Sequence, residues 1–172
     1  MYSPTRIRGH HLLCLLTYSG KGYGPAFTEN FDALVAKLNT GNSILEIVAG
    51  PDDICARPAL PPSRSVVHTE HCDSRFMRGR DTTALHHITC FLRLPRPLAA
   101  GLKFYLAEQT VQSFRQGFAA GTIRRACKSC AWHDACSEVA GSGYATVKLH
   151  PPRQRPPQET AELSHSLQRH LC

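Results

Sequence analysis

The spacing of hydrophobic residues predicts helices in several segments of this 172-residue chain. The clearest pattern lies between Pro25, which suits a first helical turn, and Gly41, which suits a helix end. It predicts one amphipathic helix over residues 25–38. The apolar residues of this stripe recur at the intervals of a single helix face: Phe27, Phe31, Leu34, Val35 and Leu38.

The remaining patterns are shorter, and together they predict an α+β fold: a small single domain, mostly helical, with a few short strands. Residues 10–18 carry leucines around most of the helix circumference, which is typical of a buried helix. Val111, Phe114 and Phe118 mark one face of another helix that ends at Gly121. Further helices are expected at 73–92 and 131–139, short strands at 6–8, 44–48 and 145–149, and residues 102–106 fit either a strand or a helix start.

Prolines divide the chain. Pro58, Pro61 and Pro62 exclude regular structure between Cys55 and Val66. From His150 onward the composition becomes rich in proline and arginine, which favours an extended, flexible tail. We therefore predict a cysteine-rich metal- or cluster-binding domain at 1–149 and a Pro-rich tail at 150–172, within which a short helix at 159–171 is compatible with the pattern.

Charge and hydropathy limit the classes of partner. Lys and Arg outnumber Asp and Glu by 20 to 13, a net charge of +7. These basic residues are scattered rather than gathered in a run, so the sequence is compatible with nucleic-acid binding but does not indicate it. The apolar run from Leu12 to Leu16 is too short for a signal peptide or a membrane span. We expect a cytoplasmic protein without a membrane partner.

Cysteines carry the strongest chemical signal, with eight in the chain. In a reducing compartment they indicate ligands or buried thiols rather than disulfides. Cys127 and Cys130 have the spacing at which one turn presents two thiolates to a metal or an iron–sulfur cluster, and Cys136 follows six residues later. Nearby basic residues favour thiolates, Trp132 is suited to shield a cluster, and His133 is a further nitrogen donor. A redox-active pair or buried structural cysteines are the alternatives.

A fourth ligand must come from elsewhere, and the sequence leaves Cys14, Cys55 and Cys72 open. His10 and His11 precede Cys14 by four and three residues, so the three side chains share one helix face and are candidate metal ligands. The same spacing recurs at His86, His87 and Cys90. Cys172 belongs to the tail, and Asp52 and Asp53 are typical of turn and cap chemistry.

The order of these motifs resembles a known family. Arg6-Ile-Arg-Gly-His10-His11-Leu-Leu-Cys14, Gly20-Lys-Gly-Tyr23, Asp52-Asp53-Ile-Cys55, His71-Cys72 and Cys127-x-x-Cys130-x-Trp132-x-x-x-Cys136 stand in that order. They resemble a family of small bacterial and archaeal cysteine-rich proteins whose domain has no known function. The resemblance covers roughly residues 5–149 and departs at Gly9, where a proline is usual. It implies an iron–sulfur or other metal site with these matched residues: Cys14, Cys55, Cys72, Cys127, Cys130 and Cys136, beside His10 and His11.

We therefore expect an iron–sulfur protein that serves electron transfer or redox sensing with an unidentified redox partner. Six matched cysteines exceed one four-ligand site, so structural thiols or a second, adjacent site would take the surplus. One alternative is a zinc-stabilised module that binds nucleic acid or protein. Another is a cysteine-dependent enzyme with His10 or His11 as the base.

Overall fold

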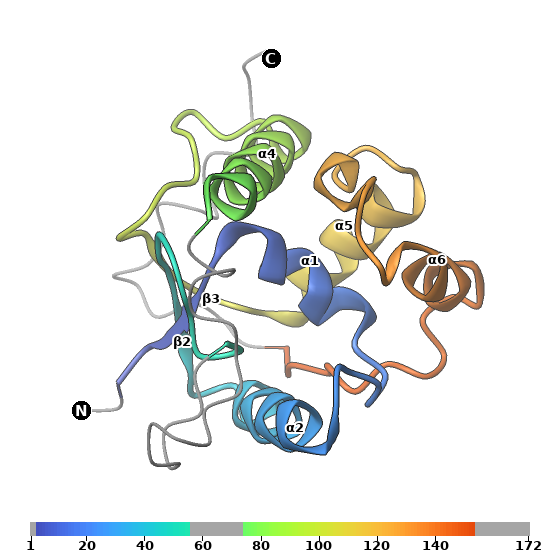
Figure 1. The fold of residues 1–172 in the computed structure, drawn as a ribbon. Helices are drawn as coiled ribbons and strands as arrows, with labels where there is room; N and C mark the ends of the chain where they lie inside the picture. Colours follow the sequence, from blue (N-terminus) through green and yellow to red (C-terminus); the bar gives the residue numbers. More distant parts are fainter. Residues whose placement is uncertain (1–2, 56–73, 154–172) are drawn as a thin grey trace.

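The computed structural model describes residues 3–55 and 74–153. Helices surround a central helix and a small sheet closes one side (Figure 1), so the predicted α+β class is confirmed. The elements follow in this order: β1 (Thr5–Ile7), α1 (Gly9–Thr17), α2 (Pro25–Asn39), β2 (Ile44–Ile47), α4 (Arg75–Leu92), β3 (Lys103–Tyr105), α5 (Glu108–Ala119), the 3-10 helix η1 (Arg125–Cys127) and α6 (His133–Gly141).

The sheet has three strands in the order β1-β2-β3. β1 and β2 are parallel, with Ile7 opposite Ile47, and β3 pairs with β2 in the antiparallel sense, with Phe104 opposite Leu45. These four side chains are buried, so the alternation of each strand directs its apolar residues to the core. The expected strands at 6–8 and 44–48 are confirmed with small shifts, and the ambiguous segment 102–106 contains a strand.

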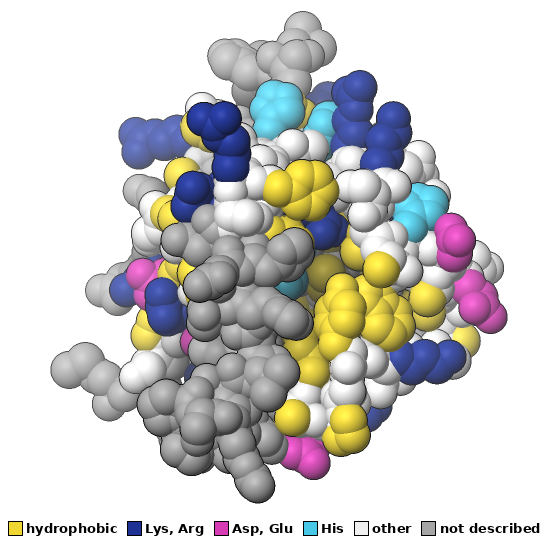
Figure 2. Space-filling view, viewed as in Figure 1, with side chains coloured by type: hydrophobic (Ala, Val, Ile, Leu, Met, Phe, Trp, Pro, Cys, Tyr) yellow, Lys and Arg dark blue, Asp and Glu magenta, His cyan; other side chains and the backbone are white. Residues whose placement is uncertain are grey.

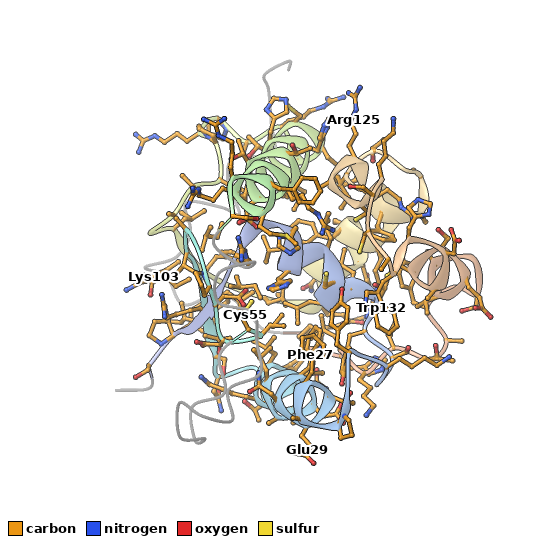
Figure 3. The ribbon with its side chains drawn as sticks, viewed as in Figure 1. Phe27, Glu29, Cys55, Lys103, Arg125 and Trp132 are labelled. Atoms are coloured by element: carbon orange, nitrogen blue, oxygen red, sulfur yellow. The ribbon has the colours of Figure 1, made fainter. Side chains whose placement is uncertain are left out.

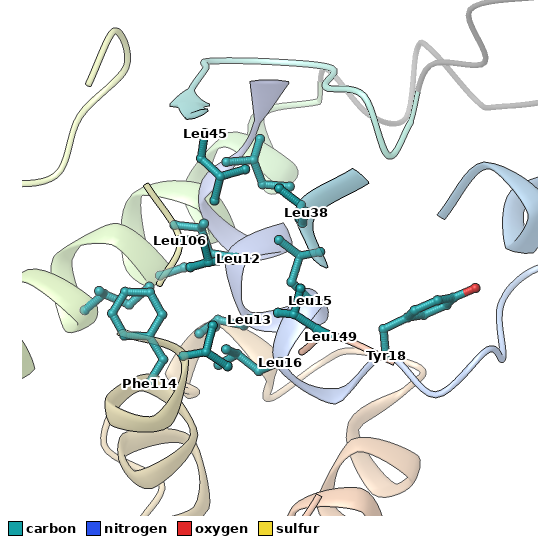
Figure 4. Packing of buried hydrophobic residues seen from close by; sticks show 14 of the residues in the cluster. Leu12, Leu13, Leu15, Leu16, Tyr18, Leu38, Leu45, Leu106, Phe114 and Leu149 are labelled. Carbon is teal, nitrogen blue, oxygen red and sulfur yellow. The ribbon is translucent and has the colours of Figure 1, made fainter. Parts of the chain in front are cut away.

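Helix α1 forms the centre of the core. Leu12, Leu13, Leu15 and Leu16 are each at most 2% exposed, which is the burial that the leucine pattern predicted. They lie among apolar residues from the sheet and the surrounding helices (Figure 4). Burying a leucine side chain contributes about 1.5–3 kcal/mol, so these residues anchor the helix that later presents the site.

The outer helices also agree with the sequence pattern. The stripe on α2 buries Phe31, Leu34, Val35 and Leu38, and α5 buries Val111, Phe114 and Phe118. α4 begins at Ser74, whose hydroxyl accepts a hydrogen bond from the Met77 backbone N–H. The expected helices at 73–92 and 131–139 are confirmed as α4 and α6, of which α6 buries no residue completely.

The strand expected at 145–149 is wrong. Val147 and Leu149 are buried and Lys148 is exposed, which is the alternation of a strand. The segment instead bonds to a side chain: Asn39 Nδ2 donates to the Lys148 carbonyl at 2.8 Å, and the His150 N–H donates to Asn39 Oδ1 at 2.7 Å. Because an amide side chain takes the place of a neighbouring strand, the residues adopt extended backbone without a ladder.

Several expectations fall outside the described residues. The irregular segment between Cys55 and Val66 and the helix at 159–171 lie there, apart from Cys55 itself, as do Cys72 and Cys172. The first residues of the proposed tail are described, and Pro151 is buried. None of the helices in the described ranges combines the length and apolar character that a membrane-spanning segment requires.

Candidate metal and cluster site

Five cysteines line one cavity, and four of them, from three segments, surround the motif. Cys14 comes from the middle of α1, Cys127 ends η1, Cys130 lies in the following turn, and Cys136 lies in α6. Packing of α1 against α6 brings the first of these to the other three. The sequence left three candidates for a ligand beside the motif. Cys72 lies outside the described residues, and of Cys14 and Cys55 it is Cys14 whose pKa the motif cysteines shift.

Successive turns of backbone shape the motif itself. The N–H of Cys127 donates to the Arg124 carbonyl at 2.9 Å, and the N–H of Cys130 donates to the Cys127 carbonyl at 3.0 Å. The N–H of His133 then donates to the Cys130 carbonyl at 3.0 Å, at the start of α6. These tight turns place the thiols of one short segment side by side, which is what Cys-x-x-Cys spacing achieves in metal sites.

The cavity has a volume of about 1200 Å³. Hydrophobic side chains border the hollow on the face shown in Figure 2. Cys55 lies on the side of the sheet and Trp132 on the side of α6, with Phe27 on α2 (Figure 3). Its lining also includes His10 and His11, so the motif cysteines and the N-terminal histidines face one shared space.

Burial dominates the titration of the thiols. It raises the pKa of Cys14 well above the ordinary value, and the three neighbouring thiols raise it further. Burial raises the pKa of Cys127 to about 11, an effect that Arg80 and Arg124 oppose. The pKa of Cys136 is raised for the same main reason. Without a cation the thiols of Cys14, Cys127 and Cys136 are protonated at neutral pH, and a bound metal must displace these protons.

Two neighbouring features bear on the chemistry of a bound group. Thr17 Oγ1 donates a hydrogen bond to Cys136 Sγ at 3.2 Å. Tyr23 stands edge-on to Trp132 with ring centroids 5.5 Å apart, and Phe27 continues this aromatic wall from Tyr23 at 5.4 Å. Hydrogen bonds to sulfur and apolar shielding are two means by which proteins tune metal–thiolate centres.

A second group of donor atoms includes His11, near the start of α1, and Cys55, which both line the same cavity. A ring nitrogen of His11, a carboxylate oxygen of Asp52 and Cys55 Sγ lie within 4.8 Å of one another. His11 Nδ1 and Asp52 Oδ2 are 2.8 Å apart. Burial alone would raise the pKa of Asp52, but the charge and hydrogen bond of His11 and the backbone donors outweigh it and hold the pKa at about 2.

His10 has its own carboxylate partner. Its Nδ1 lies 2.7 Å from Asp81 Oδ1, and its backbone N–H donates to the same oxygen at 3.1 Å. The buried guanidinium of Arg8 donates from Nε and Nη2 to Asp81 Oδ2 at 2.9 and 2.7 Å. Burial lowers the pKa of His10 to about 4, an effect that Asp81 opposes and His11 increases. His10 is therefore neutral at pH 7 and retains one ring lone pair.

The two groups differ in how closely their donor atoms approach. Thiolates around one tetrahedral zinc ion lie roughly 3.8 Å apart, because each Zn–S bond is about 2.3 Å. Within residues 3–55 and 74–153, the group with three donor atoms inside 4.8 Å is His11, Asp52 and Cys55, not the four cysteines. The cysteines nevertheless lie close enough to raise the pKa of Cys14.

Sequence reasoning missed the residues that hold the histidines. Asp81 carried no spacing signal, and Arg8 was noted only as part of a motif, although it is 1% exposed. Asp52 was interpreted as turn chemistry, which is half of its role, because Oδ1 accepts the backbone N–H groups of Ile54 and Cys55. Arg80 was not identified as a charge near the thiols. The partner of a buried charged residue is far away in the sequence, so only the folded structure identifies it.

His133, proposed as a further nitrogen donor, lines the cavity beside the motif. Its Nδ1 lies 3.0 Å from Asp134 Oδ1, a carboxylate that is fully exposed. This pair is open to solvent, unlike the buried pairs of His10 and His11. The structure thus brings together every candidate ligand in the described residues around one cavity, but in two groups.

Fold and site together define a small α+β protein with a cavity lined by cysteine and histidine. Residues 22–136 match DUF1284, a family described as proteins of unknown function, and the chain belongs to this family. The predicted membership in a family of unknown function is therefore confirmed. The matched range includes Cys55 and the motif cysteines and begins after Cys14. Neither the curated proteins nor the solved structures contain a match to this chain.

Proposed function

We propose that the protein binds an iron–sulfur cluster through Cys14, Cys127, Cys130 and Cys136, and that the cluster serves electron transfer or redox sensing. The observation that carries the proposal is the convergence of four thiols from three segments on one cavity wall. Four cysteine thiolates are the usual ligand set of [2Fe–2S] and [4Fe–4S] clusters.

The spacing of the sulfur atoms favours a cluster over a single ion. Around one zinc ion all four thiolates must converge on a point, whereas in a cluster they bind different iron atoms and stand further apart. Within the described residues, the group of three donor atoms that could hold one ion is His11, Asp52 and Cys55 rather than any three of these cysteines. This arrangement is compatible with the larger group.

The surroundings supply what such a group requires. Arg80 and Arg124 offset the negative charge of thiolates near Cys127. Trp132 and Tyr23 contribute aromatic rings to the cavity lining, and Thr17 donates to the sulfur of Cys136. When bound, the cluster supplies one-electron redox chemistry, whose potential depends on such hydrogen bonds, charge and shielding. The proposal includes a reducing, cytoplasmic setting and a redox partner that is not identified.

Anaerobic purification of the full chain tests this proposal. We expect a brown protein that contains iron and acid-labile sulfide in comparable amounts and little zinc. Colourless protein containing zinc, or no metal, would contradict it. Cys55→Ser is the matched variant, since Cys55 lies with His11, and it should keep the visible absorption. Loss of the cluster in that variant would transfer the fourth-ligand role to Cys55.

The other hypotheses remain predictions that the same measurement separates. Zinc without iron would favour the zinc-stabilised module, which salt-dependent binding of DNA or RNA would then support. Metal-free protein with one rapidly alkylated thiol would favour a cysteine-dependent enzyme.

A further inference from the structure

The part of the cavity wall that carries His11 and Cys55 has the composition of a separate metal site. His11, Asp52 and Cys55 offer nitrogen, oxygen and sulfur donors within 4.8 Å of one another. Donor atoms around one tetrahedral ion lie roughly 3.3–3.8 Å apart, so small side-chain rotations would close this group on an ion. Which of these atoms is a ligand follows from the hydrogen bonds that each already makes.

The Asp52 carboxylate is fully engaged as an acceptor. Oδ2 accepts from the Arg8 backbone N–H at 2.8 Å and lies 2.8 Å from His11 Nδ1. Oδ1 accepts from the N–H groups of Ile54 and Cys55, both at 3.1 Å. An ionised carboxylate has about four lone-pair directions, and all four are used here. Asp52 is therefore a positioning residue rather than a ligand.

This assignment fixes the tautomer of His11. Because the carboxylate only accepts, Nδ1 must donate, and the free lone pair resides on Nε2. Metal-binding histidines almost always donate their other ring N–H to a carboxylate or carbonyl in this way. His11 lines the cavity, so a carboxylate holds its ring while the second nitrogen is free to bind.

His10 repeats the arrangement beside it. Its Nδ1 pairs with Asp81 at 2.7 Å, and its ring centroid lies 4.3 Å from that of His11. His10 lies outside the 4.8 Å group, but it is the next nitrogen donor on this wall. A single general base would need one such imidazole, whereas two carboxylate-held imidazoles beside a thiol are typical of a metal centre.

We infer that Cys55 Sγ, His11 Nε2 and His10 Nε2 bind a mononuclear divalent transition metal, zinc or iron(II), with Asp52 and Asp81 holding the two rings. Three protein ligands leave at least one coordination position open to the cavity, which is the arrangement of catalytic rather than structural metal sites. The three proposed ligands line the same cavity as the four cysteines. This second centre does not depend on the identity of the group that those cysteines bind.

Cobalt(II) is the probe that tests this site. The anaerobically purified full chain is titrated with Co²⁺, and the difference spectrum is followed for thiolate-to-cobalt charge transfer. We expect one equivalent bound, with the intensity of a single thiolate. Cys55→Ser should abolish the band. His11→Gln and His10→Gln should each weaken binding by about tenfold or more, and Asp52→Asn by about tenfold to hundredfold.

Matched controls lie on α4. His86→Gln and His87→Gln alter histidines outside the cavity lining and should leave the titration unchanged. A cobalt spectrum that is unchanged in Cys55→Ser, or the absence of any cobalt band, would overturn the site. Unchanged affinity in His10→Gln would overturn the three-ligand assignment. His11→Gln keeps a donor for Asp52, so it tests the ligand even if Asp52→Asn fails to fold.

Iron and sulfide content keep this proposal separate from the cluster. If the four cysteines hold no cluster, cobalt will also bind there with the intensity of several thiolates, and Cys55→Ser will remove only the single-thiolate component. The Cys55-dependent component therefore decides the second site in either case.

Discussion

The chain carries the same pattern twice, and only one copy became part of a site. His10, His11 and Cys14 occupy α1, whereas His86, His87 and Cys90 occupy α4 at the same spacing. On α1 both rings are held by buried carboxylates through Nδ1. On α4 the two rings stand edge-on to each other with centroids 5.3 Å apart, and within the described residues neither meets a carboxylate.

The difference lies in what the fold brings to each helix. Asp52 and Asp81 are 41 and 71 residues away from the histidines that they hold. α1 lies at the centre of the molecule, where such partners converge, and α4 lies at its periphery (Figure 1). Spacing on a helix therefore identifies candidate ligands. They form a binding site only where buried carboxylates orient them and a cavity lies beside them.

Removal of Asp81 should have the largest effect, because it makes α1 resemble α4. Asp81→Asn breaks the buried ion pair between Asp81 and the Arg8 guanidinium, and breaking a buried ion pair costs about 3–5 kcal/mol. Urea unfolding of the metal-free protein measures the change. Asp134→Asn removes the exposed partner of His133 and should have no measurable effect. Equal stability of the two variants would contradict the role of Asp81.

Acid should destabilise the protein mainly through the buried His10 and much less through the peripheral His87. Below pH 6.5 the unfolded chain binds a proton at His10 that the folded chain, with a pKa of about 4, does not. In metal-free protein the free energy of unfolding should therefore fall by about 3 kcal/mol as pH drops from 6.5 to 4. The carboxylates of Asp52 and Asp81, whose pKa values are lowered, lose their contribution only below about pH 3.8.

His10→Gln should make the free energy of unfolding depend less on pH between 6.5 and 4. Urea unfolding at several pH values measures this dependence. His87→Gln should change it less, because burial lowers the pKa of His87 but the ring is only half-buried. An unchanged slope in His10→Gln would show that other groups control acid stability.

The approach of α1 to α4 gives the next effect. A side chain at Gly9 would collide with the Asp81 carbonyl oxygen and lie 2.9 Å from its Cα. Gly9→Ala should destabilise the protein by about 1–3 kcal/mol through overpacking and should displace Asp81. Gly79→Ala on α4 meets nothing within 4 Å and should stabilise the helix by up to about 1 kcal/mol. In thermal unfolding, Gly9→Ala should lower the midpoint temperature and Gly79→Ala should raise it.

Most of the fold was predictable because its helices carry local signals. The α2 stripe and the leucines of α1 report burial directly, since periodicity reflects which face meets the core. The failure at 145–149 is instructive: alternation at Val147 and Leu149 reports burial of alternate residues, but not the Asn39 side chain that replaces a strand partner. No local pattern contains that bond.

The site was predictable only in part. Cys127, Cys130 and Cys136 lie in one segment, so spacing alone grouped them. Cys14 joins them through the packing of α1 on α6, which no sequence interval encodes. Cys55 was considered with them as a fourth ligand, yet its sulfur lies with the donor atoms of His11 and Asp52.

Thr17→Val should give the smallest change. It removes the hydrogen bond to Cys136 Sγ and preserves side-chain volume. In cluster-loaded protein the reduction potential should fall, because a donor to sulfur stabilises the more negative, reduced state. A redox titration measures the shift. Ser137→Ala, which removes a hydroxyl bonded to Arg124 and the His133 carbonyl rather than to sulfur, should leave the potential unchanged.

The two cysteines of the repeated pattern give the most direct test of the cluster. Cys14→Ser and Cys90→Ser are purified without air, and their iron and acid-labile sulfide are compared with those of the wild-type chain. Cys14→Ser should lose most of its iron and sulfide, whereas Cys90→Ser should retain both. A Cys14→Ser protein with wild-type iron, sulfide and visible absorption would contradict the assignment of Cys14 as the fourth ligand.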